Sequence, residues 1–580
     1  MIPTPDLSRW RTVVVGPGIV GMPMAALLAD ATRRLDAEPG EVVVVQRASR
    51  TSGWKVDAIN RGESPIGGVE PALDALVATN AAAGTLRATH TYDVCGAAHL
   101  ILVCVQTDRK DLSPDYGPLF EALHGIAAAL AAAPDRKAPL LVIESTLAPS
   151  TMESVIAPLF ATYGLQEGRD IHLGNSPNRV MPGRLVERVA AADKLVGALA
   201  PETARRIAAI YARIVTGGRL WETTSTAAEI VKTLENAYRD VRIAFAAEVA
   251  RWCDAHDIDF HAVREAANEQ IGRSDAASRD GMAVPSGALL VPTLGVGGHC
   301  LPKDGILLWW RAIEAGRATS HSLIIASREI NDASPGLTAA LATARVGPLS
   351  GKRVAILGAA YRGDSEDTRN APALVLARLL RGNGAHVTLH DPYVRPTDAN
   401  IAAAVLTDAL TTSLDGALRD AEVVFVAVAH APYRGLPRFL DQVAPHARLL
   451  VDGANLYTAS DFERCQAGYV GIGKGRKAPS PALIDAVVAQ FRAVERGVAH
   501  EVSDMVDFLN ARGTWSDGHL VRYADVQAMA RSCATGCDLV DVDPVDPWTS
   551  HPFESRLAVL ARKRWGYALP YDAPRVVVAS

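Results

Sequence analysis

A β-branched strand that runs through a glycine-rich turn into an alanine-rich helix is the feature that most restricts the fold of this chain. In the segment TVVVGPGIVGMPMAALLAD, Gly16, Gly18 and Gly21 form a GxGxxG pattern between the predicted strand and the predicted helix. Such glycines permit a tight turn and the close approach of a pyrophosphate, whose charge meets the N-terminus of the helix. The sequence therefore predicts a dinucleotide site, with Ile19 and Val20 beside the ligand. A glycine-rich turn without a ligand is the alternative.

The choice of dinucleotide depends on the residues at the end of the next predicted strand, Glu41 to Ser49. An acidic side chain normally stands there and holds the ribose of NAD. Gln46 and Arg47 occupy the position instead. Either Arg47 or Arg50 is able to pair with the 2′-phosphate of NADP, although each is equally consistent with solvated surface. We expect NAD as the cofactor and leave NADP open.

Strand-like and helix-like segments alternate along two parts of the chain. AHLILVCVQT and PLLVIESTL continue the first part, and residues 351–394 begin the second, with a strand that ends at Gly358 and another that closes on Asp391. Alternation of this kind predicts doubly wound parallel sheets. We expect an α/β protein with two Rossmann-like domains. Because only one glycine stands at the second turn, a nucleotide is a better candidate there than a dinucleotide, and a domain without ligand is the alternative.

A long amphipathic helix is predicted between the two Rossmann-like parts, from Thr226 to Asp257. Apolar residues recur there at intervals of three and four: Ile230, Leu234, Tyr238, Val241, Phe245, Val249 and Trp252. Unbroken, the helix would be about 45 Å long. Lys232, Asn236 and Arg239 share a different stripe, for which a solvated polar face is the simplest interpretation.

The length of 580 residues predicts several domains. We expect a dinucleotide-binding domain over 1–205, a helical domain with the connecting helix over 206–335, and a second Rossmann-like domain over 336–480. Residues 481–580 form an extension of unassigned fold. Its Trp515, Trp548 and Trp565 are predicted to pack on the body of the protein or on a neighbouring subunit.

Composition favours a small-molecule partner. The formal net charge of -5 gives no reason to expect nucleic acid or an anionic membrane, and no apolar run approaches the roughly 20 residues of a membrane span. The N-terminus lacks the pattern of a signal peptide, so we expect a cytoplasmic protein. The seven cysteines are few and odd in number, which argues against disulfides. Cys533 and Cys537 lack the usual spacing of a zinc site, so no metal is expected.

The segment Gly295 to Asp304, GVGGHCLPKD, sets a cysteine in a site-like environment. Cys300 follows flexible glycines and stands beside His299, Lys303 and Asp304, whereas a structural cysteine is usually surrounded by apolar residues.

The chain resembles the UDP-glucose and GDP-mannose dehydrogenases, and within them the branch that acts on UDP-N-acetylhexosamines. The resemblance covers roughly residues 10 to 480 and is carried by motifs in order: GPGIVG, ESTLAPST, SPNRVMPGR, EIVKTLENAYRDVRIAFAAE, GVGGHCLPKD, REIND and GDSEDTRNAP. The GVGGHC form, in place of GFGGSC, is similar to the N-acetylhexosamine branch, and UDP-glucose is the alternative substrate. The product would serve a surface polysaccharide or a secondary metabolite.

This resemblance implies a double oxidation of the sugar C6 alcohol to a carboxylate. Lys232 and Asn236 would hold the developing oxyanion, and Cys300 would add to the aldehyde to give a thiohemiacetal and then a thioester. Asp304 resembles the aspartate that orients water and the active lysine. Nearby Lys303 or Lys232 would favour the thiolate.

Further roles follow from the resemblance alone. Thr107 and Thr146 resemble threonines near the nicotinamide or the catalytic water, with Glu144 preceding the latter, and each is equally consistent with a polar residue at a strand end. The residues predicted to contact the sugar nucleotide are Arg239, Gly297, Gly298, Arg362 and Arg369, and the two glycines would let the backbone approach the sugar. The family usually forms homodimers through the long central helix, and the apolar stripe here allows that prediction.

Four departures from the family pattern bear on activity. Asn178 replaces a glutamate implicated in thioester hydrolysis, and a neutral amide cannot act as a base. Arg362 replaces a lysine, Ala454 stands where an arginine commonly contacts the nucleotide sugar, and QTDRK replaces a PTP turn. A catalytically impaired nucleotide-sugar-binding protein is therefore the alternative to an active dehydrogenase, although Lys232, Asn236, Cys300 and Asp304 are retained.

Overall fold

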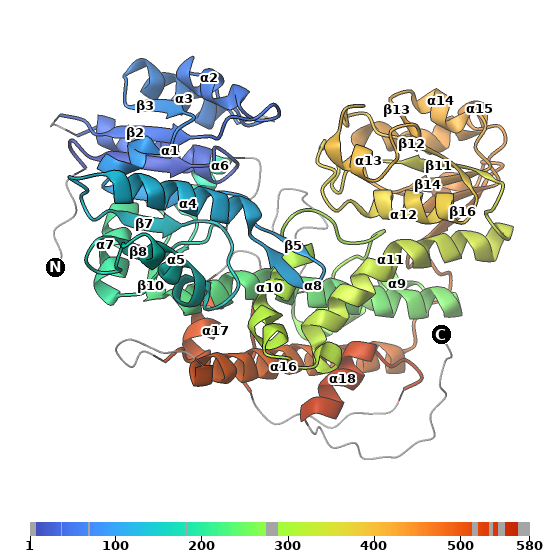
Figure 1. The fold of residues 1–580 in the computed structure, drawn as a ribbon. Coiled ribbons are helices and arrows are strands. Elements are labelled where there is room, and N and C mark those ends of the chain that lie inside the picture. Colours follow the sequence, from blue (N-terminus) through green and yellow to red (C-terminus); the bar gives the residue numbers. More distant parts are fainter. Residues whose placement is uncertain are drawn as a thin grey trace. The chain divides into compact units, whose positions relative to one another are not determined.

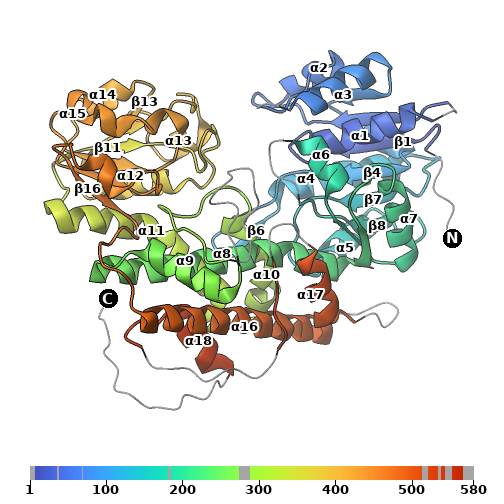
Figure 2. The same ribbon diagram turned by 180° about the vertical axis from the view of Figure 1, so that it is seen from behind.

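The computed structural model describes residues 7–35, 38–67, 70–179, 184–273, 288–512, 520–532, 537–542 and 551–565. Trp515, Trp548, Cys533 and part of the SPNRVMPGR motif lie outside these ranges. The chain divides into two compact units (Figures 1 and 2). Unit 1 comprises Met1–Glu235, Ile306–Arg317 and Val502–Asp538, and unit 2 comprises Asn236–Gly305, Ala318–Glu501 and Leu539–Ser580.

Unit 1 is built around an eight-stranded sheet with the order β10-β9-β8-β7-β4-β1-β2-β3. Its strands are β1 (Arg11–Val15), β2 (Glu41–Val45), β3 (Leu86–Thr89), β4 (Leu100–Val103), β7 (Leu140–Ile143), β8 (His172–Asn175), β9 (Lys194–Ala198) and β10 (Leu220–Thr224). Neighbouring strands are parallel except for β8 and β9, which run antiparallel. The predicted doubly wound parallel sheet is confirmed, with this one antiparallel contact added.

Alternate residues of these strands face two separate helical layers. Val14, Val42 and Val44 pack in one core with α1 (Gly21–Arg33), α3 (Pro71–Ala82) and α7 (Pro201–Tyr211). Val13 and Val15 face the other core, with α4 (Gly117–Ala132) and α5 (Ala157–Thr162). Because successive strand residues point to opposite faces, a continuous run of valines is buried on both sides.

Unit 2 contains the second Rossmann-like sheet, with the strand order β13-β12-β11-β14-β15-β16 and every neighbouring pair parallel. Its strands are β11 (Arg353–Leu357), β12 (His386–His390), β13 (Leu410–Thr411), β14 (Val423–Val426), β15 (Leu449–Asp452) and β16 (Gly468–Gly471). The helices α12 (Pro372–Gly382), α13 (Ala399–Ala403), α14 (Leu414–Leu418) and α15 (Leu440–Val443) connect them. The second predicted α/β domain is confirmed.

The predicted central helix is α8 (Ser225–His256), 32 residues long. It is followed by α9 (Phe260–Ile271), α10 (Leu301–Glu314) and α11 (Leu323–Val346). Asp259 caps α9 by accepting hydrogen bonds from two backbone N–H groups, and Gly272 ends it in the left-handed conformation. The described part of the unassigned extension contains three helices, α16 (Pro481–Arg512), α17 (Tyr523–Arg531) and α18 (Arg556–Trp565). No helix within the described ranges is long and apolar enough to cross a membrane.

Candidate active site

The turn between β1 and α1 has the geometry that a dinucleotide requires. Gly16 has φ +96°, and a Cβ placed there would lie 2.7 Å from the carbonyl oxygen of Cys104. A Cβ at Gly21 would lie 2.1 Å from the carbonyl oxygen of Gly16. At Gly18, by contrast, an added Cβ would meet nothing within 4 Å, so this side of the turn is open. The two outer glycines close the turn and the middle one leaves room for a pyrophosphate.

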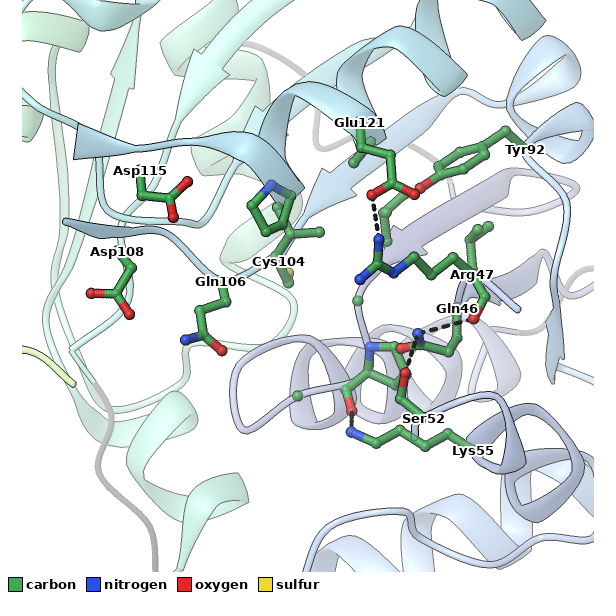
Figure 3. Close-up of a pocket in the computed structure, with 18 residues that line it drawn as sticks. Gln46, Arg47, Ser52, Lys55, Tyr92, Cys104, Gln106, Asp108, Asp115 and Glu121 are labelled. Carbon is green, nitrogen blue, oxygen red and sulfur yellow. Dashed lines mark hydrogen bonds and ion pairs between the residues drawn. The ribbon is translucent and has the colours of Figure 1, made fainter. Parts of the chain in front are cut away.

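A cavity of about 470 Å³ opens at this turn (Figure 3). Gly16 and Gly18 line it, together with Gln46 and Arg47 from the end of β2. This is the carboxyl edge of parallel strands, where Rossmann folds bind their ligands. The residues therefore fit a dinucleotide. Ile19 is exposed and Val20 packs on the helical core, so neither belongs to the lining of the cavity.

Strand β2 ends at Val45, four residues earlier than predicted. Gln46 and Arg47, which follow it, each interact with the side chain of another residue. The Gln46 amide donates a hydrogen bond to Ser52 Oγ at 3.0 Å. The Arg47 guanidinium pairs with Glu121 of α4 across the cavity, and both side chains are about half exposed (Figure 3). Arg50 is exposed and does not line the cavity. Of the two arginines considered for a 2′-phosphate, only Arg47 faces the site.

The ends of β4 and β7 hold the two predicted threonines next to each other. The hydroxyl of Thr107, which is buried, donates a hydrogen bond to the carbonyl oxygen of Thr146 at 2.9 Å. The QTDRK departure forms a short antiparallel hairpin, β5 (Asp108–Lys110) with β6 (Ser113–Asp115), and its Asp108 and Asp115 line the cavity.

A buried network surrounds Glu144 in unit 1. Its carboxylate pairs with Lys194 Nζ at 2.8 Å and accepts a hydrogen bond from the phenol of Tyr211. The Asn178 amide donates to the same carboxylate at 3.2 Å. Burial raises the pKa of Tyr211 well above its usual value. Position 178 lacks the carboxylate of the family pattern, but the side chain of Asn178 is hydrogen-bonded to the carboxylate of Glu144. Sequence reasoning did not identify Lys194 or Tyr211, because no local motif contains them.

Arg179 connects this region to the C-terminal extension. Its guanidinium pairs with Glu235 of α8, with both side chains almost fully buried. It also donates hydrogen bonds to the carbonyl oxygen of Met529, in the last turn of α17, at 3.1 Å and to Ser532 Oγ, just after this helix, at 3.2 Å. The segment next to Asn178 is therefore held by residues for which the sequence predicted no role.

In unit 2, Cys300 stands immediately before α10 and is exposed. Its carbonyl oxygen accepts hydrogen bonds from the backbone N–H groups of Lys303 and Asp304, at 3.2 and 3.0 Å, which forms the first turn of the helix. The Asp304 carboxylate accepts a hydrogen bond from the Asn236 amide of α8 at 2.6 Å and pairs with Lys303 Nζ. Lys232 is largely buried and precedes Asn236 by one turn of α8.

Three predicted site residues are thus brought together or adjacent: Asn236, Asp304 and Cys300. Lys303 is one of the two lysines expected to favour the thiolate of Cys300. It is instead buried, and its ammonium group forms an ion pair with the Asp304 carboxylate. Because a buried ammonium needs a counter-charge, this pairing accounts for its position.

The packing of Tyr361 also requires glycine at positions 297 and 298, in addition to any room needed for a sugar. A Cβ at Gly297 would lie 2.6 Å from Tyr361 Cβ, and one at Gly298 would lie 2.9 Å from the ring of Tyr361. Gly298 donates a backbone hydrogen bond to the carbonyl oxygen of Arg369 at 2.9 Å and accepts one from the Asn370 side chain at 3.0 Å. The cysteine loop is thereby fastened to the loop after β11. Sequence reasoning missed Tyr361 and Asn370, although Asn370 lies within the DTRNAP motif.

The remaining predicted substrate residues are less closely grouped. The Arg369 guanidinium pairs with Asp367, and this hydrogen bond raises its pKa. Arg362 is exposed, and Arg239 is half-buried on α8. The backbone N–H of Ala454 donates to Asp452 at 3.2 Å in the loop after β15.

Comparisons with known proteins cover most of the chain. Residues 10–215 match the NAD binding domain of the UDP-glucose/GDP-mannose dehydrogenase family, residues 226–333 its central domain and residues 355–459 its UDP binding domain. A UDP-N-acetyl-D-mannosamine dehydrogenase of Pyrococcus horikoshii is 30% identical over 472 residues, which span 80% of this chain and 99% of that protein. An NDP-N-acetyl-D-galactosaminuronic acid dehydrogenase of Ralstonia solanacearum is 28% identical, over 78% of this chain and 97% of that protein.

Solved structures of two such dehydrogenases also superpose on most of the chain. The crystal structure of NDP-N-acetyl-D-galactosaminuronic acid dehydrogenase from Methanosarcina mazei Go1 superposes with a TM-score of 0.67 at 30% identity, covering 81% of this chain and 96% of that chain. The P. horikoshii enzyme superposes with a TM-score of 0.65 at 29% identity, covering 80% and 99%.

Proposed function

Since the chain belongs to the UDP-glucose/GDP-mannose dehydrogenase family, we propose that it oxidises the C6 alcohol of a UDP-N-acetylhexosamine to a carboxylate in two NAD-dependent steps. The observation that supports this most is the exposed Cys300 at the start of α10, with Asp304 one turn later bound to Asn236 and Lys303. The N-acetylhexosamine is favoured by the substrates in the names of the relatives.

In the first step, the C6 alcohol loses a proton and a hydride and becomes an aldehyde. NAD, when bound at the glycine turn, accepts the two electrons of each oxidation. Lys232 and Asn236 lie one turn apart on the same side of α8, where their N–H donors would stabilise the alkoxide oxygen as it forms. Asp304 fixes the Asn236 amide by accepting its hydrogen bond, so the amide is oriented before the substrate arrives.

In the second step, the thiolate of Cys300 adds to the aldehyde carbon, and a C–S bond forms. Loss of a second hydride from that carbon leaves a thioester, and water then cleaves the C–S bond to release the carboxylate and restore the thiol. The position of Cys300 immediately before α10 sets the thiolate at the positive end of the helix dipole.

Hydrolysis of the thioester is the step most affected by the departure at position 178. Asn178 cannot remove a proton from water, and its amide is bound to Glu144. Asp304 is the remaining carboxylate beside the cysteine loop. A binding protein without full turnover is the second candidate function, and Asn178 together with Ala454 favours it.

Counting reduced cofactor per sugar separates these functions. The purified protein is incubated with limiting UDP-N-acetylmannosamine, UDP-N-acetylglucosamine or UDP-glucose and excess NAD or NADP, and the absorbance at completion is recorded. About two reduced cofactors per sugar support the proposal, whereas none supports the binding protein. The variant Cys300→Ser should stop at the aldehyde, with Cys465→Ser as the matched control. Full double oxidation by Cys300→Ser would refute the assigned nucleophile.

A further inference from the structure

The apolar stripe of α8, assigned by the sequence to a dimer contact, is covered in unit 2 by the C-terminal extension. The phenol of Tyr238 donates a hydrogen bond to Glu495 of α16 at 2.7 Å. The ring of Phe245 packs edge-on against Phe491 of α16 and against Phe553 before α18, with centroids 5.8 and 6.5 Å apart. The face predicted to join two copies is therefore buried within one copy.

Contacts at the start of α18 are specific rather than merely apolar. Glu248 of α8 accepts hydrogen bonds from Ser555 Oγ at 2.7 Å and from the backbone N–H of Arg556 at 2.8 Å, so its carboxylate caps the N-terminus of α18. Burial raises the pKa of Glu248, and these donors oppose that rise. Arg556 also pairs with Glu329 of α11 at 2.6 Å. The extension thus has a defined docking position on unit 2.

The direction and length of α16 match those of a second copy of α8. Along α16 the contacts advance from Phe491 to Glu495, while along α8 they go back from Phe245 to Tyr238. The two helices therefore run antiparallel, as Figures 1 and 2 show for both views. Each is 32 residues long. A twofold axis across α8 would place its own copy antiparallel on the same face.

The extension lies beyond the part of the chain that the family domains match. The P. horikoshii protein aligns over 99% of its own length but only 80% of this chain, and the family domains end at residue 459. A buried aromatic side chain covers about 150–250 Å². Three of them on one helix face, Tyr238, Phe245 and Trp252, amount to about 450–750 Å², which is as large as the largest apolar patch of a typical monomer, about 300–600 Å², or larger. A chain without the extension needs another cover for this face.

We propose that α16 and α18 take the place of a second copy on α8, so that one chain is the stable unit in solution. The proposal concerns assembly and does not depend on which sugar is oxidised. It replaces the homodimer through the central helix that the sequence predicts.

Molar mass in solution is the primary test. Light scattering during size exclusion of the full chain should give a mass near 61.4 kDa at every concentration loaded. A mass of about twice that value would overturn the proposal. Hydrogen exchange of the same protein supplies a second measurement, because the amides of 238–252 should be equally protected at low and high protein concentration. Protection that increases with concentration would indicate a second copy and contradict the proposal.

Releasing the extension should restore self-association. In the double variant Phe491→Asp, Phe553→Asp, we expect amides of 556–565 to exchange at least tenfold faster and the mass to rise toward two chains as concentration increases. Leu520→Asp, at an exposed position of the extension, is the matched control and should behave as the unchanged protein. A double variant that stays a single chain with the extension released would refute the idea that α16 and α18 cover a dimer face.

Discussion

Gly297 allows the coupling between the cysteine loop and the second Rossmann-like domain to be tested with one methyl group. A Cβ at this position would lie 2.6 Å from Tyr361 Cβ, 2.8 Å from the carbonyl oxygen of Asn370 and 2.9 Å from Pro372 Cδ. None of these atoms is the free end of a flexible side chain. The variant Gly297→Ala must therefore move the loop that carries Cys300, because its neighbours cannot yield.

The size of the displacement follows from the contacts. Ordinary van der Waals contact for a Cβ begins at 3.4 Å, so the shortfall at Tyr361 is 0.8 Å. A shift of about 1 Å in a reacting group costs about 100-fold in rate. We expect kcat/KM for the sugar nucleotide to fall about 100-fold, equivalent to about 2.7 kcal/mol of transition-state stabilisation. The dissociation constant of NAD should not change, because the glycine turn at residues 16–21 is not altered.

Steady-state kinetics with the preferred sugar nucleotide, together with NAD binding followed by fluorescence, checks this expectation. Gly382→Ala is the matched control, because a Cβ there would meet nothing within 4 Å. A Gly297→Ala variant whose kcat/KM stays within about threefold of the unchanged protein would refute the argument that Tyr361 fixes the cysteine loop.

Three other experiments test the cofactor site, the buried charges and the response to pH. Gln46→Asp should weaken NADP binding at least about tenfold relative to NAD, because a carboxylate there repels a 2′-phosphate; dissociation constants measured by fluorescence check this. Arg179→Met leaves the carboxylate of Glu235 buried without its cation. The free energy of unfolding should fall by about 3–5 kcal/mol, which a lower melting temperature would show. Arg9→Met removes a pair with Glu38 in which both side chains are largely exposed, so it should lower the melting temperature much less. Burial raises the pKa of Glu229 from 4.5 to about 8. Between these two pH values the folded protein keeps a proton on Glu229 that the unfolded chain releases. The free energy of unfolding therefore falls as pH rises from 4.5 to 8. Glu229→Gln should therefore raise the melting temperature at pH 8 and leave it nearly unchanged at pH 4; an equal shift at both would contradict the assigned titration.

The sequence by itself determined the two α/β domains, the dinucleotide turn and the central helix. These features depend on patterns within one short segment: β-branched runs, glycines at fixed spacing and apolar residues every three or four positions. It also selected Asn236, Cys300 and Asp304, because the order of the motifs is read along the chain. The extra antiparallel contact of β9 was not predicted, since strand direction depends on which edge of the sheet the chain reaches.

Only the tertiary structure decided what each candidate residue touches. Lys303 binds Asp304, Arg47 binds Glu121, and Tyr361 closes over Gly297. In each case except the first, the partners are more than 60 residues apart in the sequence. Such contacts result from packing of distant segments, and no local periodicity records them. The same reason explains the apolar stripe of α8: the sequence shows that the stripe must be covered, and only the folded chain shows that its own C-terminal helices cover it.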